Sequence, residues 1–393
     1  MKYKLKDLGE IVTGNTPSKS NAEFYKSKDI GFVKPDILIE GIINENLNVN
    51  EYISERARKK ARIVQAGAIF VTCIGSIGKI GIADKELAFN QQINAILPNE
   101  KVYPKYLAYC MLQNKKNLQA IANAPIVPII NKSQFGEIDI EIEENKEKQF
   151  QIIEILEEVS SVIEKRRKQL QQMDKLVKSR FIGMFGDPIS NPFGWQVKKL
   201  ADVSVLITNG NTPKGGSENY VNEGIMFLRS QNVWRNRIDL EDVAYIDKDT
   251  HVAMAKSSVH DKDILITKTG RINTENSSLG RAALFHGADN SANINGHVYL
   301  VRLDKTVVPE YVVAILTGEP YRRYIRKVCV GGIDKRQINL DQVENFPIIL
   351  PPIELQEQFA NFVKQTDKSK AVIQKALDET QLLFDSLMQK YFG

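Results

Sequence analysis

The chain has 393 residues, of which 42% are hydrophobic and 26% charged, a balance typical of a globular protein with two or three domains. Lysine and arginine total 53 against 48 aspartate and glutamate, a net charge of +5, which permits nucleic-acid binding without requiring it. No run of about 18 apolar residues occurs, so no membrane-spanning helix is expected. The first residues lack the apolar core of a signal peptide. We therefore expect a cytoplasmic protein.

The first segment, residues 1–145, is predicted to be an α+β domain. The sequence Gly-Asn-Thr-Pro at 14–17 has turn chemistry, and the β-branched run Ile69–Thr72 predicts a strand. A helix is expected to begin near Pro104, because proline is well placed in the first turn of a helix.

A long helix is predicted from about residue 146, within a segment that we bound at 146–187. It has no proline before 188 and no glycine before Gly183. Its apolar residues recur in steps of four and three, the heptad period of a coiled coil. This apolar stripe of the first helix consists of Ile152, Leu156, Val159, Ile163, Leu170, Met173 and Val177. Arg166 fills the one missing position.

The second half of the chain repeats the first half in order. Gly-Asn-Thr-Pro recurs at 210–213, so that Gly14 and Gly210 are 196 positions apart. Matches continue in the same order between 67–72 and 262–267, 90–94 and 295–299, 104–107 and 309–312, and the Phe-Gly endings at 185–186 and 392–393, now 207 apart. Loop insertions in the second copy would produce this drift, so we infer an internal repeat with a second domain at 188–350.

The second helix, in the segment 351–393, carries an apolar stripe of the same period. Its apolar members are Phe359, Val363, Ile373, Leu377 and Phe384, interrupted by Thr366, Lys370 and Thr380. Each helix of about 40 residues would be roughly 60 Å long and cannot bury its stripe alone. We expect the stripes to pack on each other as a coiled coil; the alternative is that each helix packs on its own domain. Spare apolar residues suggest a further face for a partner protein: Phe362, Leu383, Leu387 and Tyr391.

No set of residues typical of catalysis or metal binding stands out. There is no GxxxxGK[ST] loop, and the cysteines Cys73, Cys110 and Cys329 form no CxxC pair, which disfavours a P-loop ATPase and a zinc cluster. Asp36 with Glu40 resembles a nuclease motif, but isoleucine stands at 42 where its lysine would. The sequence 191–193 resembles an amino-methyltransferase motif that lacks one proline, and a turn is the simpler interpretation. The four histidines, all in the second copy, are expected to have structural or DNA-contacting roles: His251, His260, His286 and His297.

Base-specific reading of DNA requires donors and acceptors on a shaped surface, with cations for the phosphates. In the first copy the candidates are Asn15, Thr16, Lys19, Lys34, Ser76, Lys79, Gln91 and Gln92. In the second copy they are Asn211, Thr212, Lys214, Arg229, Gln231, Asn232, Arg235, Arg237, Lys268, Arg271, Arg281, Asn295, His297, Lys335 and Arg336. The alternative is that most of them are ordinary solvated loop residues. These loops diverge more between the copies than the framework does, which favours two readers of different sequences on one scaffold.

The chain resembles, over its whole length, the specificity (S) subunit of type I restriction-modification systems. The resemblance is carried by the two Gly-Asn-Thr-Pro openings, the Leu-Pro-Pro-x-x-x-Gln entry into the second helix at 350–356, and the two Phe-Gly endings. The first helix entry departs from the pattern, because Glu-Ile-Glu-Glu at 141–144 replaces the prolines.

The resemblance implies two globular target recognition domains separated by two long helices, which form an antiparallel coiled coil with pseudo-twofold symmetry. Each domain would read one half of a bipartite, asymmetric site in double-stranded DNA, and the helices would set the gap. Two modification (M) subunits would dock on the helices and methylate adenine with S-adenosylmethionine. Restriction (R) subunits would add translocation and cleavage that depend on ATP and Mg²⁺.

The chain itself would therefore be non-catalytic, with no cofactor, no metal and no membrane partner. The alternative from another class is a single-chain enzyme that modifies or cleaves DNA.

Overall fold

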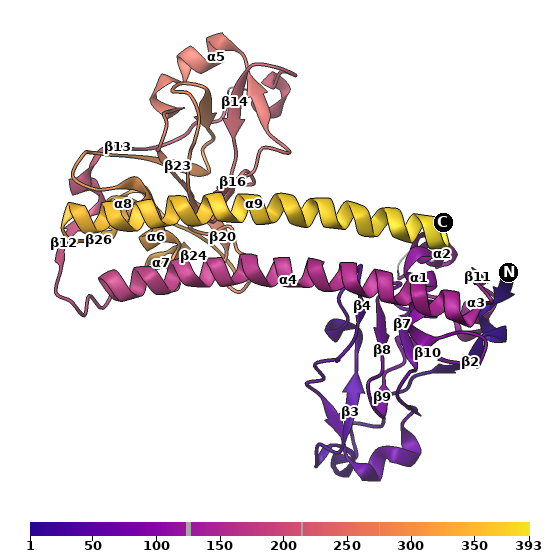
Figure 1. Ribbon diagram of the computed structural model, residues 1–393. Coiled ribbons are helices and arrows are strands. Elements are labelled where there is room, and N and C mark those ends of the chain that lie inside the picture. Colours follow the sequence, from indigo (N-terminus) through magenta and orange to yellow (C-terminus); the bar gives the residue numbers. More distant parts are fainter. Residues whose placement is uncertain (123–126, 214, 275) are drawn as a thin grey trace. The chain divides into compact units, whose positions relative to one another are not determined.

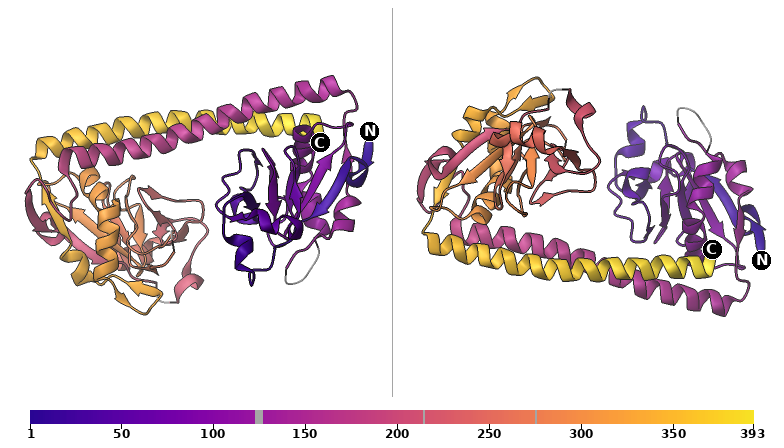
Figure 2. Two further views of the ribbon diagram at one scale, coloured as in Figure 1. Left: turned by 90° about the horizontal axis from the view of Figure 1, so that it is seen from below. Right: turned by 90° about the horizontal axis from the view of Figure 1, so that it is seen from above.

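The computed structural model describes residues 1–122, 127–213, 215–274 and 276–393. It divides into two compact units (Figure 1). The first unit consists of Met1–Arg167 with Lys375–Gly393, and the second of Lys168–Gln374. Each of the two long helices therefore contributes to both units. Both chain ends belong to the first unit (Figure 2). No helix of the described residues is long and apolar enough to cross a membrane.

The first unit has two small mixed sheets, ordered β2-β10-β7-β8-β4 and β5-β3-β9-β6, and a β1-β11 pair. Its strands are β1 (Lys2–Lys4), β2 (Gly9–Thr13), β3 (Ile30–Val33), β4 (Ile43–Asn44), β5 (Tyr52–Ile53), β6 (Ile63–Val64), β7 (Ile69–Thr72), β8 (Ile80–Ile82), β9 (Leu87–Phe89), β10 (Ile93–Pro98) and β11 (Asp139–Glu141). Its short helices are α1 (Pro104–Gln113), α2 (Lys115–Ile121) and α3 (Lys132–Gly136).

The second unit has the matching sheets β13-β23-β19-β21 and β17-β14-β22-β18, and the matching pair β12-β26. Its strands are β12 (Gln196–Lys199), β13 (Ser204–Asn209), β14 (Ile225–Leu228), β15 (Val233–Trp234), β16 (Arg237–Ile238), β17 (Ala244–Ile246), β18 (Ser258–Val259), β19 (Ile264–Thr267), β20 (Thr269–Arg271), β21 (Ala282–Leu284), β22 (Ala292–Ile294), β23 (Val298–Leu303), β24 (Val330–Gly331), β25 (Lys335–Gln337) and β26 (Pro347–Leu350). Its short helices are α5 (Lys248–Ala253), α6 (Pro309–Thr317), α7 (Glu319–Val328) and α8 (Leu340–Glu344).

The strand order and the register confirm the internal repeat. In both units the central strand pairs antiparallel with two neighbours, Ile93 opposite Thr72 in the first and Val298 opposite Thr267 in the second. The strand predicted at 69–72 has the expected bounds, and its repeat match at 264–267 is also a strand. The helix predicted near Pro104 begins there, and the matching helix begins at Pro309.

The described part of the second unit has additions that the described part of the first does not show. These are the β15-β16 hairpin and the strand β24, whereas the pair β20-β25 has a counterpart in the isolated bridge between Ile74 and Ile129 of the first unit. The loop between β19 and β21, residues 268–281, is longer than the matching loop between β7 and β8, residues 73–79. Part of the drift from 196 to 207 therefore arises in this loop.

The two long helices are α4 (Lys146–Phe185) and α9 (Ile353–Phe392) (Figure 1). They pair antiparallel within each unit. In the second unit Phe359 near the start of α9 packs on Phe185 at the end of α4. Further along α9, Lys370 Nζ lies 2.7 Å from Oδ1 of Asp174, which comes earlier in α4. In the first unit the guanidinium of Arg166 donates to Ala376 O and to the Thr380 hydroxyl. Arg166, which interrupts the apolar stripe of the first helix, thus forms a polar layer with α9.

The apolar stripes face inward on both helices. Leu156, Ile163, Phe359, Leu377 and Phe384 are buried, and the remaining apolar stripe members are half-buried. Coiled-coil pairing and packing on a domain both occur, so the two alternatives are combined and not exclusive. Of the spare apolar residues, Leu383 is exposed, while Phe362, Leu387 and Tyr391 are half-buried.

The Phe-Gly endings have a packing role that the repeat conserves. Phe185 at the end of α4 packs 4.8 Å from the Tyr311 ring of the second unit. Phe392 at the end of α9 packs 5.2 Å from the matching Tyr106 ring of the first unit. Each long helix is thus anchored to a globular core by an aromatic pair at its C-terminus.

Candidate nucleic-acid interface

The sheet register places the first copy's candidate residues along one edge of the first unit. Thr13 at the end of β2 lies opposite Asn94 near the start of β10, and Thr72 at the end of β7 lies opposite Ile93. The parallel strands β3 and β9 end together at Val33 and Phe89. The loops that follow these strand ends hold Asn15, Thr16, Lys34, Ser76, Lys79, Gln91 and Gln92. We call this the loop edge of the first unit.

The second unit has a loop edge built in the same way. Asn209 at the end of β13 lies opposite Tyr299, and Thr267 at the end of β19 lies opposite Val298. Leu228 and Ile294 end the parallel strands β14 and β22 together. The segments beyond these strand ends hold Asn211, Thr212, Arg229, Lys268, Arg271, Arg281, Asn295 and His297, of which Arg271 ends the short strand β20.

The Gly-Asn-Thr-Pro motif joins the two sheets at each loop edge. A Cβ on Gly14 would lie 2.1 Å from Asn90 O, and one on Gly210 would lie 2.0 Å from Ile294 O. The Asn15 side chain accepts from Arg62 N and donates to Lys60 O, each at 2.6 Å. The motif therefore shapes the loop edge through close backbone contact and hydrogen bonds.

Alanine at Gly14 is expected to destabilise the first unit by about 1–3 kcal/mol, because its Cβ meets backbone oxygen that cannot move without shifting β9. Chemical denaturation of the full chain measures this loss. Gly41→Ala is a matched control for a loop glycine, since nothing lies within 4 Å of its added Cβ, although its φ of +80° adds local strain. Equal destabilisation by both changes would argue against a packing role for Gly14.

The predicted DNA-contact residues differ in accessibility. Those that are exposed are Lys19, Ser76, Gln91, Asn211, Thr212, Gln231, Arg237, Arg271, His297 and Lys335. Those that are half-buried are Asn15, Thr16, Lys34, Lys79, Gln92, Arg229, Arg235, Lys268, Asn295 and Arg336. Asn232 and Arg281 are buried, and Lys214 lies outside the described residues. DNA contact by these residues stays a prediction.

Asn232 has its polar atoms bound within the fold. Its side chain accepts from Arg229 N at 2.9 Å and donates to the carbonyls of Asp239 and Asp242, each at 3.0 Å. Asp242 also accepts from the guanidinium of Arg229 at 3.2 Å and from Gln231 at 2.5 Å. This network fixes the turn after β14, so that Asn232 supports the loop edge from inside.

A polar pocket of about 450 Å³ lies at the loop edge of the second unit. The antiparallel pair β20-β25, in which Arg271 lies opposite Lys335, contributes to its lining. It is lined by Thr269, Gly270, Arg271, Thr274, Asn276, Ser277, Ser278, Arg281 and Lys335. Hydroxyls, amides and cations therefore converge on one hollow, a mixture of groups that can bond to base edges or to phosphate.

The basic helix α7 borders this loop edge and was not among the predicted contacts. Its Arg322, Arg323, Arg326 and Lys327 follow one another in a short run. Ile325 of α7 lies under Gly280 of the 268–281 loop. Arg235 donates to Glu319 at the start of α7, and burial, followed by the nearby Arg322, lowers the pKa of Arg235. The run of four cations in six residues was the sequence signal that could have identified this face.

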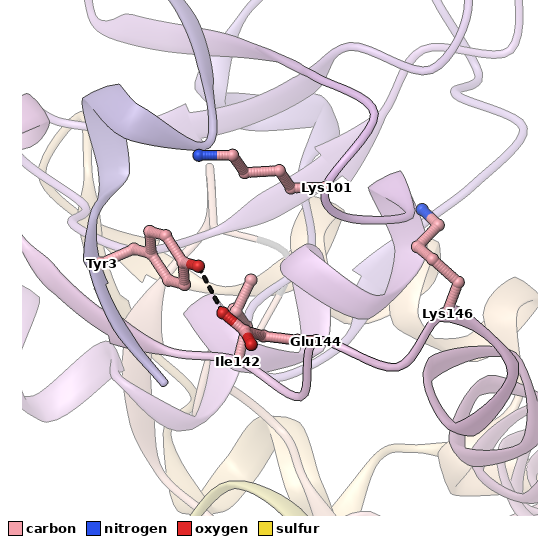
Figure 3. A pocket seen from close by; sticks show the side chains of 5 residues that line it. All are labelled: Tyr3, Lys101, Ile142, Glu144 and Lys146. Atoms are coloured by element: carbon pink, nitrogen blue, oxygen red, sulfur yellow. Dashed lines mark hydrogen bonds between the residues drawn. The ribbon is translucent and has the colours of Figure 1, made fainter.

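A second pocket, of about 210 Å³, lies at the start of α4 and is lined by none of the predicted DNA contacts (Figure 3). The Tyr3 hydroxyl donates to Glu144 at 2.5 Å, a bond that raises the pKa of Tyr3. Lys101 Nζ lies 5.1 Å from the Tyr3 ring centroid. Asn145 caps the helix by accepting from Glu147 N at 2.9 Å. These contacts stabilise the beginning of α4. The first copy lacks at this point the two prolines that precede α9 in the second copy.

The motifs weighed for catalysis have structural surroundings. Glu40 accepts from Lys115, and that hydrogen bond lowers the pKa of Glu40. Asn191 has a φ of 47° and bonds to both Trp195 N and Trp195 O, so the predicted turn at 191–193 is confirmed. His251 Nδ1 lies 2.5 Å from Asn293 Oδ1. Among the described residues, no cluster of three metal-ligating side chains occurs.

The cysteines are buried within the two units. Burial is the main cause that raises the pKa of the Cys73 thiol to about 12. A thiol with so high a pKa is a poor nucleophile at neutral pH.

A family model described as the type I restriction modification DNA specificity domain matches the chain twice, over residues 1–172 and 192–380. The chain belongs to this family. The MjaIX specificity subunit of a type I restriction enzyme from Methanocaldococcus jannaschii is 24% identical over 98% of this chain and 91% of its own length. The HindI specificity subunit from Haemophilus influenzae is 33% identical over 35% of this chain and 30% of its own length.

Solved structures support the same fold. The S subunit of a type I restriction-modification system from M. genitalium aligns over 100% of this chain and 96% of that chain, with a TM-score of 0.59 and 14% identity. A chain from a study of assembly and conformational transition of the type I R-M system aligns over 100% of this chain and 97% of that one, with a TM-score of 0.54 and 14% identity.

Proposed function

We propose that this chain is the specificity subunit that selects the DNA sequence for a type I restriction-modification complex. Each unit reads one half of a bipartite, asymmetric site in double-stranded DNA. The observation that carries the proposal is the pair of loop edges, built by the same strand register in both units and furnished with different side chains. A common scaffold with unlike contact groups suits the reading of two unlike sequences.

The divergence of the loop edges argues against a palindromic site. Gln91 and Gln92 of the first unit stand where the second has Gly296 and His297. Only the second unit's 268–281 loop and β25 supply the residues of the 450 Å³ pocket. A symmetric site would require like contact groups in both halves.

The modification and restriction subunits supply the chemistry in this proposal. Two M subunits bind S-adenosylmethionine and methylate adenine, and R subunits use ATP and Mg²⁺, all in the cytoplasm. Large apolar side chains stay exposed on α4 and α9, which supports docking of M subunits there. In the first unit these are Phe150, Ile155, Leu382 and Leu383, and in the second they are Leu176, Ile182 and Val372.

Exchange of residues 188–350 for the matching domain of another family member is expected to change one half of the methylated site and leave the other half unchanged. The reason is that each loop edge is formed by strands of its own unit. Sequencing of methylated adenines in cells that carry the hybrid subunit with its M subunits measures both halves. The unexchanged subunit is the control. A hybrid that altered both halves would contradict independent reading.

The rival functions give distinct results. A single-chain enzyme would methylate or cleave DNA without partners, so turnover by the isolated chain with S-adenosylmethionine or Mg²⁺ would overturn the proposal. A pure assembly scaffold would show no salt-sensitive binding to duplex DNA when the M subunit is present. Sequence-selective, salt-sensitive binding by the complex is the expected result.

A further inference from the structure

The long loop of the second unit and the matching loop of the first unit share one pattern of hydrogen bonds to the strand before them. Thr72 O accepts from Gly78 N and Thr72 Oγ1 from Lys79 N, at 2.9 and 3.0 Å. Thr267 O accepts from Gly280 N and Thr267 Oγ1 from Arg281 N, at 3.0 and 2.9 Å. Arg281 is therefore the structural counterpart of Lys79, although the loop before it is longer.

The two counterparts hold their side chains differently. Lys79 is half-buried, and its Nζ donates to Pro35 O at 3.3 Å. Arg281 is buried, and its guanidinium donates to Ser277 O at 3.0 Å and to Asn276 O at 2.5 Å. Both of these acceptors belong to the wall of the 450 Å³ pocket.

The Arg281 guanidinium is also held from outside the loop. It lies 3.9 Å from the ring centroid of Trp234, on the β15-β16 hairpin, which has no counterpart among the described residues of the first unit. The hairpin is fixed in turn to the strand that begins after Arg281, because Asn236 N donates to Ala282 O at 2.9 Å. A planar cation that is stacked on indole and bonded to two carbonyls is strongly restrained.

We propose that Arg281 is a positioning residue, which with Trp234 sets residues 276–278 so that the pocket reads the edge of a base pair in the second half-site. The direct contacts come from the loop's hydroxyl and amide groups and from Arg271, which is exposed and pairs with Asp334 at 3.3 Å. The fork of an arginine guanidinium suits the two acceptors of guanine. This inference rests on the proposed function of the second unit.

The test compares Arg281→Met with wild type in the complex with M subunits, on the methylated site and on sites with single base-pair changes. We expect discrimination at one position of the second half-site to fall about tenfold or more, the scale of one lost bidentate base contact. Discrimination in the first half-site and the slope of log affinity against log salt stay at wild-type values. Arg271→Ala is expected to lose discrimination at the same position.

Two further substitutions separate positioning from charge and from folding. Arg281→Lys keeps the charge but not the two carbonyl bonds or the stacked plane, so it is expected to behave like Arg281→Met. Trp234→Phe keeps a ring face and is expected to retain most of the discrimination, whereas Trp234→Leu loses it. If Arg281→Met melts at a lower temperature than wild type, the base-pair discrimination of the folded Arg281→Lys variant decides whether the inference holds. Lys79→Met is the matched control and leaves the second half-site unchanged.

Several results would overturn the inference. Uniform weakening of Arg281→Met on all sequences, with a salt slope smaller by about 0.9, would identify a phosphate contact instead. Wild-type discrimination by Arg281→Met or by Arg281→Lys would show that the restraint is not needed. A wild-type complex that binds all sequences equally would instead overturn the proposed function itself, so the two failures are distinguishable.

Discussion

Replacement of Asp263 by alanine is expected to destabilise the second unit by about 3 kcal/mol. Asp263 is 1% exposed, and its carboxylate accepts from Arg302 Nε at 2.9 Å and from Arg302 Nη2 at 2.7 Å. It also accepts from His260 N at 2.7 Å. The substitution leaves the Arg302 guanidinium without its charge partner and one backbone donor unpaired. Because the Arg302 side chain is a quarter exposed, the loss is expected at the low end of the range for buried pairs.

The internal repeat supplies the control for this prediction. Ala68 and Leu97 occupy the matching two positions in the first unit, where Ala68 is buried in an apolar cluster that Leu97 packs against. The double substitution of Asp263→Ala with Arg302→Leu copies that apolar pair. It is expected to recover most of the lost stability, because replacing both partners leaves no uncompensated charge. Denaturant unfolding measures the change, and amide exchange in β19 and β23 locates it in the second unit. Equal instability of the single and double variants would argue against this account.

The repeated framework could be predicted from the sequence because it rests on local periodicity. Strand residues at 69–72 and 264–267 are fully buried, so their hydrophobicity marks them directly. The apolar stripes follow from a period of 3.5 residues, and all their apolar members are buried or half-buried. Collinear motifs such as Gly-Asn-Thr-Pro survive in both copies because Gly14 and Gly210 have no room for a Cβ.

The detail of the loop edges could not be predicted, because residue type does not reveal the partners of a polar side chain. Asn232 and Arg281 have the chemistry of DNA contacts, yet both are buried and bonded to backbone carbonyls. The restraint on Arg281 depends on Trp234, which is 47 positions away in the sequence and reaches it through the β15-β16 hairpin. Long-range contacts of this kind leave no periodic signal.

Insertion of four residues into each long helix is expected to lengthen the gap of the recognised DNA site by about two base pairs. Four residues add about 6 Å to a helix, and a base pair occupies about 3.4 Å along DNA. α4 and α9 are continuous helices of 40 residues, and each contributes to both units. Insertion points after Arg167 and after Gln374 fall at the boundaries of the units. Four residues are close to one helical turn, so each stripe keeps nearly the same face.

The identity of both half-sites is expected to stay unchanged, because neither insertion alters a loop edge. Sequencing of methylated adenines in cells with the lengthened subunit measures the half-sites and the gap together. The matched control replaces four exposed residues at the same points without adding length, and it should keep the original gap. Insertion into α4 alone should lower the stability of the subunit. The Arg166–Thr380 and Lys370–Asp174 contacts lie on either side of the insertion point, so α4 and α9 could no longer form both in register. A lengthened subunit that methylated the site with its original gap would show that the helices do not set the spacing.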